Sequence, residues 1–399
     1  MLAAALTAFS REPPAIAGRP EPGPYRVATT AYHERRPGSP HGMTASDASR
    51  RGGQMEDGRA AYRLYVGVDI AAETFVAAWL TPGGKPTAPF TGEQTPAGFA
   101  ALQGRLRAVA VPPAATLVVV EATGNYWVAL AVALHEAGYR VAVVNPRQAH
   151  HFAKAQLRRA KTDALDARDL AQLAAALRPA PWVPPPAVYH EVRQRLVARD
   201  GLLAMRTQAR NQRHALLQWP VVVAGVRQHL DELITDLDRR VAALEGEIAA
   251  VLQESAWAEA LACLTSAPGL GLVTAAWLLV GTLNFALCAG PDALTAYAGL
   301  APVPRESGRT IRGRPSIGHD GNARLRTALY MATLSATRYN PAIKAFYQRL
   351  RAAGKPHKVA RCAAAGKLLH QAWALGSKQQ RFDPNHGQPR PVDSPELAA

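Results

Sequence analysis

The stretch LVVVEATGNYWVALAVALHEAGYRVAVVNP, residues 117–146, decides the fold. LVVVEATG at 117–124 is a continuous apolar run, which is typical of a buried strand. NYWVALAVALHEAG at 125–138 has helical periodicity and ends on Gly138, a common residue just past a helix. YRVAVVNP at 139–146 is a second buried strand. Strand, helix and strand in this order predict part of an α/β sheet.

The flanking segments extend this sheet. YRLYVGVDIAAETFVAAWL at 62–80 is predicted to form strand, turn and strand, and residues 89–109 lead into a helix. Residues 147–179 are predicted to be a basic loop followed by a helix. Residues 62–180 are therefore expected to form an α/β domain with a mixed sheet.

The next segment is helical. PAPWVPPPAVY at 179–189 is a Pro-rich connector and a good domain boundary. Residues 190–259 carry apolar side chains near heptad spacing, which predicts two long antiparallel helices broken near Trp219-Pro220. This coiled-coil arm, residues 181–260, is expected to be a structural arm or dimer interface. Its arginines also fit a nucleic-acid contact, and both roles stay open (Arg193, Arg195, Arg199, Arg206, Arg210 and Arg213).

A mostly helical domain is predicted over residues 261–376. Residues 261–291 contain no charge, but Pro, Gly and Asn interrupt them, so a buried helix is favoured over a membrane span. LTSAPGLGLVTAAWLLVGTL at 264–283 resembles a helix-hairpin-helix, whose turn amides contact a DNA phosphate; a plain helical hairpin is the alternative. Residues 1–61 are expected to be disordered or a mis-assigned start, and 377–399 a disordered tail.

Charge and cysteine content restrict the partners. Lys and Arg outnumber Asp and Glu by 46 to 30, a net charge of +16, which favours nucleic acid first and an anionic membrane surface second. Codon usage in a GC-rich genome would also enrich arginine. The three cysteines form no CxxC pair, so a zinc ribbon is not supported, and they suit a reducing cytosol. We expect a cytoplasmic protein associated with the bacterial nucleoid.

Four carboxylates stand out. Asp69 and Glu121 each lie at the end of a predicted strand, and Asp163 and Asp166 lie three residues apart on a predicted helix, on one face. Mg²⁺ takes oxygen ligands, and two such ions can activate a nucleophile and stabilise a leaving oxygen on a phosphodiester. Taken singly, each residue is better explained as a turn, cap or ion-pair residue, and Asp169 continues the spacing. The four together favour a metal site.

The order of VGVDI, VVVEATGNYW and KTDALDARDLA resembles the DEDD-type insertion-sequence transposases over about residues 62–375. VNPRQAHHFAKA is similar to the same family. The resemblance implies a ribonuclease-H-like, resolvase-like first domain in which Asp69, Glu121, Asp163 and Asp166 bind Mg²⁺ or Mn²⁺. It also implies a second domain with a nucleophilic serine, DNA as substrate, a structured bridge RNA as guide and a homo-oligomer, dimer or tetramer. The basic flank of the aspartate pair is expected to bind nucleic acid (Arg158, Arg159 and Lys161).

The serine is expected in the most basic loop. AYAGLAPVPRESGRTIRGRPSIGHDGNARLR, residues 296–326, resembles the family segment that holds the catalytic serine, which points to Ser307, with Ser316 as the alternative. Arginines around it suit phosphate clamping and stabilisation of an alkoxide (Arg305, Arg309, Arg312 and Arg314). From spacing alone, a phosphate-binding loop without a nucleophile fits as well. His319-Asp320 stands where family members carry two positive charges, which puts the strength of nucleic-acid binding in question.

Three other functions compete with a transposase. A resolvase-like endonuclease would use the carboxylates and water, without a covalent serine. A non-catalytic nucleic-acid-binding protein would bind with a steep salt dependence and cut nothing. An actin-like sugar kinase would need a Gly-rich phosphate loop between Asp69 and Glu121, and PGG at 82–84 is only a turn.

Overall fold

The computed structural model describes residues 62–122, 124–156, 163–307, 311–317 and 321–385. Within the chain two compact units are distinguished, with the division after Pro184. This boundary falls inside the Pro-rich segment 179–189. The predicted disordered start, residues 1–61, lies outside the described residues.

The first unit is built on a mixed five-stranded sheet, as predicted. β1 (Leu64–Ile70) and β2 (Thr74–Leu80) form an antiparallel hairpin, and β4 (Thr116–Glu121) and β5 (Arg140–Val144) run parallel to β1. A short edge strand, β3 (Phe90–Glu93), pairs with β2 and was not predicted. The order in the sheet is β3-β2-β1-β4-β5. The parallel strands β1, β4 and β5 therefore end at the same edge.

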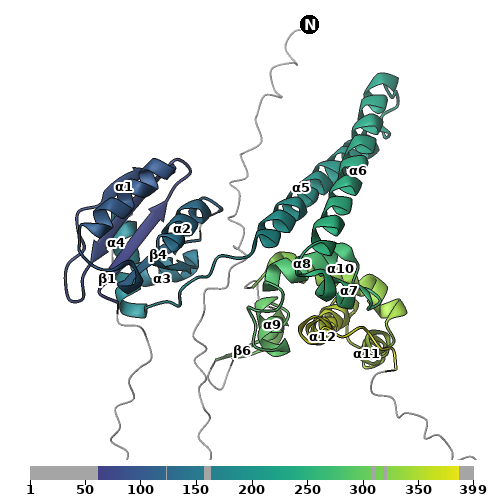
Figure 1. Cartoon of the computed structure of the whole chain (residues 1–399). Coiled ribbons are helices and arrows are strands. Elements are labelled where there is room, and N and C mark those ends of the chain that lie inside the picture. Colours follow the sequence, from purple (N-terminus) through teal and green to yellow (C-terminus); the bar gives the residue numbers. More distant parts are fainter. Residues whose placement is uncertain (1–61, 123, 157–162, 308–310, 318–320, 386–399) are drawn as a thin grey trace, which may run out of the picture. The chain divides into compact units, whose positions relative to one another are not determined.

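Alternation along the strands gives the sheet two buried faces. Val66 and Val118 belong to a core packed under α1 (Pro96–Arg107) and α2 (Trp127–Glu136), and the turn η1 (Pro113–Ala115) precedes β4. Tyr65 and Val119 point the other way, into a second core with α4 (Asp163–Leu177). Figure 1 shows these helices around β1 and β4. The apolar runs of the sequence thus correspond to strands that are covered on both sides.

The prediction of a basic loop after β5 is wrong for residues 146–155. These residues form α3 (Pro146–Ala155), which Asn145 caps by accepting a hydrogen bond from the amide of Arg147 at 2.8 Å. Pro146 at the first helical position supports the same start. The sequence contained this capping signal, but the run of polar and basic residues concealed it.

The second unit begins with the two long antiparallel helices that the sequence predicted. α5 (Ala187–Leu216) and α6 (Ala224–Gln253) are joined by a turn that contains Trp219 and Pro220 (Figure 1). Leu196, Val241 and Ile248 are buried along their length. A periodic apolar stripe, rather than intrinsic propensity alone, stabilises helices of this length against each other.

The remaining helices pack around α8 (Leu272–Thr282), which is buried from Ala275 onward, as expected for the uncharged segment. They are α7 (Ala258–Thr265), α9 (Pro291–Tyr297), α10 (Ala323–Tyr339), α11 (Pro341–Ala352) and α12 (His357–Lys378). Among the residues described, no helix is both long and apolar enough to cross a membrane.

The turn between α7 and α8 packs against α10 and the residue that follows it. Gly269 has a φ of +102°, and a side chain there would clash with Ala336 of α10. Asn340, which is fully buried, donates to the carbonyl oxygen of Pro268 at 3.3 Å and to Gln371 at 2.8 Å. Packing therefore accounts for the glycine in this turn, and the phosphate contact of a helix-hairpin-helix stays a prediction.

A second difference concerns the segment predicted as a basic loop around Ser307. The backbone forms an antiparallel hairpin of β6 (Pro302–Ser307) and β7 (Ile311–Ile317).

The predicted disordered tail, residues 377–399, is described as far as residue 385. The amide of Phe382 donates to Ser266 Oγ at 2.8 Å. The rest of the predicted tail, residues 386–399, lies outside the described residues.

Candidate functional site

Asp69 and Glu121 lie on neighbouring parallel strands at the same edge of the sheet. The register pairs Val68 of β1 with Val120 of β4, so Asp69 and Glu121 follow as the next pair. Neighbouring strands are about 4.8 Å apart, which places the two backbones side by side. Both residues are half-buried, and Asp69 Oδ1 accepts a hydrogen bond from the amide of Ile70 at 3.1 Å.

Both carboxylates belong to the face of the sheet that α4 covers. Side chains alternate along a strand, and Tyr65 on β1 and Val119 on β4 lie in the core under α4. Gly67, two residues before Asp69, approaches α4 so closely that a Cβ atom there would overlap the backbone at Ala167 and Ala171. The helix is therefore seated on the strands beside the ends that carry Asp69 and Glu121.

The aspartates of α4 lie at the start of this helix. Asp163 is the first residue of α4 and so begins the helix rather than preceding it as a cap; its side chain lies outside the described part of the chain. Asp166 is half-buried and immediately precedes Ala167, the residue that meets Gly67. Asp169 is buried, with 7% of its surface exposed. The structure thus brings Asp166 into the neighbourhood of the strand ends.

The donor set fits a hard divalent cation. Two carboxylates on adjacent strands, with a third on the covering helix, supply the oxygen ligands that Mg²⁺ and Mn²⁺ take. Within the described side chains, no three His, Cys, Asp or Glu groups already converge on one point. Asp69, Glu121 and Asp166 therefore do not form such a cluster by themselves, and the side chain of Asp163 lies outside the described part of the chain.

The turn after Glu121 is fixed by contacts that the sequence did not reveal. Gln94 Nε2 donates to the carbonyl oxygen of Ala71, just after β1, at 3.4 Å and to that of Tyr126, after β4, at 3.2 Å. Trp127 Nε1 donates to Gly124 O at 3.2 Å, and Gly124 has a φ of +59°. One glutamine side chain therefore joins the two strand ends that carry the carboxylates.

A basic stripe adjoins the same edge. Because α3 begins two residues after Val144, the partner of Glu121, its first turn lies at this edge. Four exposed residues at helical spacings i, i+3, i+4 and i+7 share one face of α3, and we call them the α3 stripe (Arg147, His150, His151 and Lys154). The spacing of these four residues in the sequence is the signal that could have predicted the α3 stripe. The predicted basic flank at Arg158, Arg159 and Lys161 lies outside the described residues.

Ser307 is the last residue of β6 and pairs with Ile311 of β7. The side chains of Ser307, Arg305, Arg309, Arg312 and Arg314 are not described, so their mutual positions stay a prediction. Ser316, the alternative nucleophile, pairs with Val303 and is exposed. The two serines thus lie toward opposite ends of one hairpin.

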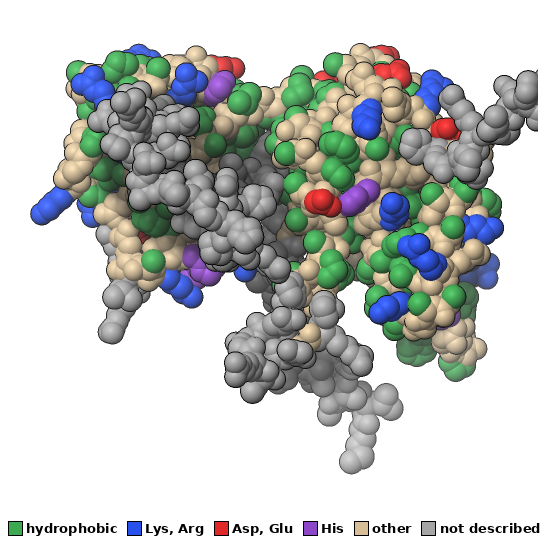
Figure 2. Space-filling model, turned by 90° about the horizontal axis from the view of Figure 1, so that it is seen from below, with side chains coloured by type: hydrophobic (Ala, Val, Ile, Leu, Met, Phe, Trp, Pro, Cys, Tyr) green, Lys and Arg blue, Asp and Glu red, His purple; other side chains and the backbone are tan. Residues whose placement is uncertain are grey.

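The helices that follow form a basic surface that the sequence interpretation had passed over. Residues 321–382 contain no Asp or Glu but many cations (Arg324, Arg326, Arg338, Lys344, Arg349, Arg351, Lys355, Lys358, Arg361, Lys367, Lys378 and Arg381). Figure 2 shows Lys and Arg side chains gathered over part of this unit, with few acidic side chains among them. Such a surface attracts a polyanion.

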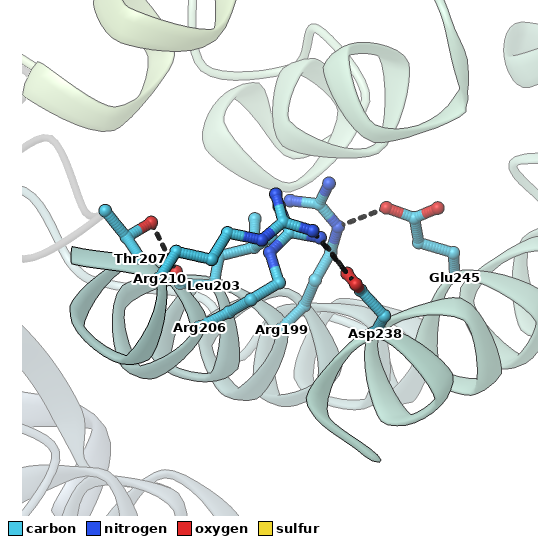
Figure 3. A network of polar contacts seen from close by, with 7 residues as sticks. All are labelled: Arg199, Leu203, Arg206, Thr207, Arg210, Asp238 and Glu245. Carbon is cyan, nitrogen blue, oxygen red and sulfur yellow. Dashed lines mark hydrogen bonds and ion pairs between the residues drawn. The ribbon is translucent and has the colours of Figure 1, made fainter. Parts of the chain in front are cut away.

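The arginines of the α5–α6 arm have a different role, because most of them face carboxylates of the partner helix. Arg195 contacts Glu247 at 3.0 Å, Arg199 contacts Glu245 at 2.6 Å, and Arg210 contacts Asp238 at 2.9 Å. Arg206 also binds Asp238, and Arg213 binds Asp231. Figure 3 shows Arg206 and Arg210 on α5 extending toward Asp238 on α6, to which both donate hydrogen bonds. Of the two roles left open by the sequence, the structure favours the structural arm for these five residues.

Both units match known transposases. Residues 66–219 match a transposase family model, and residues 261–348 match the model described as the transposase IS116/IS110/IS902 family. The chain is 31% identical to the pilin gene-inverting protein of Moraxella lacunata over 324 residues, which cover 80% of this chain and 98% of that protein. It is 32% identical over 177 residues to the insertion element IS900 uncharacterized 42 kDa protein of Mycobacterium paratuberculosis, covering 44% of this chain and 43% of that one.

These matches extend over both the unit with the carboxylates and the unit with the serine hairpin. The first match begins within β1 and ends just after α5, and the second begins within α7 and ends within α11. The chain belongs to the IS116/IS110/IS902 family of transposases, and its activity is that of a DNA transposase or recombinase.

Proposed function

We propose that this transposase cuts and rejoins DNA with a metal-binding carboxylate tetrad, Asp69, Glu121, Asp163 and Asp166, and with Ser307 as the nucleophile. The observation that carries the proposal is the placement of Asp69 and Glu121 on adjacent parallel strands, on the one face that α4 covers. A five-stranded sheet of this order also supports a ribonuclease-H-like domain.

The tetrad would hold Mg²⁺ or Mn²⁺ at the edge where β1 and β4 end. When bound, the metal supplies Lewis-acid stabilisation of charge on the phosphodiester oxygens. Gln94 fixes the backbone after both strands, and Gly67 allows α4 to pack closely against β1. Both residues therefore act by positioning the carboxylates.

Ser307 would perform a transesterification. Its Oγ attacks the phosphorus, a serine–phosphate ester forms, and the bond from phosphorus to one deoxyribose oxygen breaks. The released sugar oxygen takes up the proton that the serine hydroxyl loses, so no other reactant is consumed. The positive charges of Arg305, Arg309, Arg312 and Arg314 would stabilise the charge that develops on the non-bridging oxygens.

The site is further proposed to act with a structured guide RNA and in a homo-oligomer, with a serine from one subunit serving the carboxylates of another. The net charge of +16 and the acid-free segment 321–382 support a nucleic-acid partner of large area. The long α5–α6 arm supports the oligomer, since it extends as a helical pair with exposed apolar residues near its turn (Leu217, Trp219, Val221, Val223 and Val226).

The metal site can be tested by measuring Mn²⁺ binding to the protein, without any DNA cleavage. Mn²⁺ titration of the full chain, followed by electron paramagnetic resonance, should show binding that Asp69→Asn and Glu121→Gln each weaken at least about tenfold. Glu73→Gln, in the turn after β1, is the matched control and should bind like the unaltered protein. Equal Mn²⁺ binding by Glu121→Gln would refute the tetrad.

A further inference from the structure

The second unit contains a cavity of about 860 Å³ that none of the proposed steps uses. It lies between α9, α10, α12 and the end of the hairpin farthest from the β6–β7 turn. Pro302 and Ser316 line it from the hairpin, Arg326 and Tyr330 from α10, and Lys358 and Cys362 from α12. Its volume is in the usual range for ligand sites.

The lining combines apolar walls with positive charge. Leu300, Ile317 and Val359 contribute carbon surface, and the ring of Tyr330 lines the cavity. Arg326 and Lys358 are its charged residues, and no Asp or Glu is among the lining residues. Arg326 Nη1 donates to the carbonyl oxygen of Ala298 at 3.3 Å, which holds the guanidinium at this wall. A flat apolar ring joined to an anionic group is the ligand that this lining fits.

The cavity is close to the proposed nucleophile along the hairpin. Ser316, in the cavity wall, pairs with Val303, and Ser307 follows Val303 by four residues on β6. Four residues of extended strand span roughly 13 Å, or about four base steps of a DNA strand. A nucleotide near the cut phosphate can therefore reach the cavity.

We infer that this cavity receives an unpaired nucleobase of the DNA, stacked against Tyr330, with the adjoining phosphate held by Arg326 and Lys358. The inference rests on the proposed function, because it takes DNA as the substrate of the hairpin. Unpaired bases stack on aromatic side chains without sequence preference, and cations along the groove follow the backbone. The acid-free segment 321–382, which includes α10 and α12, supplies the same attraction over a wider area.

Cys362 offers a direct readout. Cys263 and Cys288 are buried, whereas Cys362 is half-buried and lines the cavity. Burial raises the pKa of the Cys362 thiol, against the lowering effect of the Arg326 charge, so labelling is best done at mildly alkaline pH. The rate of alkylation of Cys362 then reports whether the cavity is filled.

The experiment compares three duplex oligonucleotides of one sequence: fully paired, with a short bubble of unpaired thymines, and with a bubble of abasic sites. Each is bound to the full chain, and alkylation of Cys362 is followed by peptide mass spectrometry. We expect the thymine bubble to slow alkylation several-fold, and the paired and abasic duplexes to slow it little. Equal protection by the abasic bubble would overturn the inference, because a base would then not be the group that fills the cavity.

Two substitutions test separately the binding of the nucleobase in the cavity and the binding of the adjoining phosphate. Ala363→Phe, which narrows the cavity, should weaken binding of the thymine bubble but not of the paired duplex. Lys358→Gln should lower affinity and reduce the salt slope by about one. Lys344→Gln on α11, outside the cavity, is the control for the loss of one charge. If the thymine bubble binds but alkylation of Cys362 is unchanged, the inference about the cavity is rejected and the proposed function is not. If none of the DNA molecules binds, the proposed function is rejected.

Discussion

Gly67 is the residue at which β1 and α4 come into close backbone contact. It has no side chain where β1 passes under α4, and a Cβ atom there would overlap the backbone at Ala167 and Ala171. Any other residue would force α4 away from β1. The close approach of two backbones is thus a requirement of the core and, under the proposed function, of the metal site.

Gly67→Ala should therefore destabilise the first unit, by about 1–3 kcal/mol, through overpacking against a helix that cannot yield locally. Urea unfolding monitored by circular dichroism measures the change. Gly104→Ala on α1 is the matched control, since nothing lies within 4 Å of its Cβ position, and it should stabilise by about 0.5–1 kcal/mol. A Gly67→Ala protein as stable as the unaltered one would show that α4 is not seated on β1 as described.

The α5–α6 arm shows at the scale of an element how charge and packing cooperate. Asp238 binds Arg206 and Arg210, and Asp236 binds Arg239 and Arg240. Hydrogen bonds from Arg206, together with the charges of both arginines, lower the pKa of Asp238. Hydrogen bonds from Arg240 and Arg239 lower the pKa of Asp236 in the same way.

These lowered pKa values predict a pH dependence of stability. A carboxyl group whose pKa is lower in the folded protein contributes fully above its unfolded pKa, about 4, and loses that contribution as the pH falls through the folded value. The unfolding temperature should therefore fall between pH 5 and pH 3, and by less in Asp238→Asn. The effect is small because the pair is exposed to solvent. If the unfolding temperature falls equally in the unaltered protein and in Asp238→Asn, Asp238 does not contribute to the pH dependence.

Elements also show what the sequence could predict. β1, β2, β4 and β5 were predicted because buried strands are apolar runs, and the charges of Asp69 and Glu121 are conspicuous at their ends. The hairpin β6–β7 was missed because Pro302, Pro304 and Gly313 disfavour strands locally, so its pairing depends on tertiary context. The four residues of β3 are too few for a periodic signal, and Gln94 carries no signal at all.

At the scale of the whole chain, the uneven distribution of charge along the sequence is the feature that relates fold to function. The α3 stripe adjoins the carboxylate edge, and residues 321–382 of the second unit include many cations and no Asp or Glu. Each unit therefore contains a basic segment that could contact DNA. A protein that binds DNA through such contacts releases counterions in proportion to the phosphates neutralised.

The double variant Arg147→Gln/Lys154→Gln should accordingly bind DNA more weakly, and the slope of log affinity against log salt should fall by up to about two. Lys85→Gln/Arg140→Gln removes the same charge at the opposite edge of the sheet, where β2 ends and β5 begins, and should leave the slope unchanged. Filter binding over a series of salt concentrations makes the measurement. Equal slopes for the two double variants would exclude the α3 stripe from the DNA interface.

The central claim of the proposed function is that Ser307 forms a covalent bond to DNA and that this reaction needs the metal bound by the carboxylate tetrad. The direct measurement is recovery of a protein–DNA adduct after incubation with DNA that includes the flanks of the gene, with the linked residue identified by peptide mass spectrometry. We expect an adduct on Ser307 in Mg²⁺, none with Ser307→Ala or Glu121→Gln, and an unchanged adduct with Ser316→Ala. Metal-dependent cutting without any adduct would contradict the claim and identify a resolvase-like endonuclease, and an adduct on Ser316 would refute the assignment of Ser307.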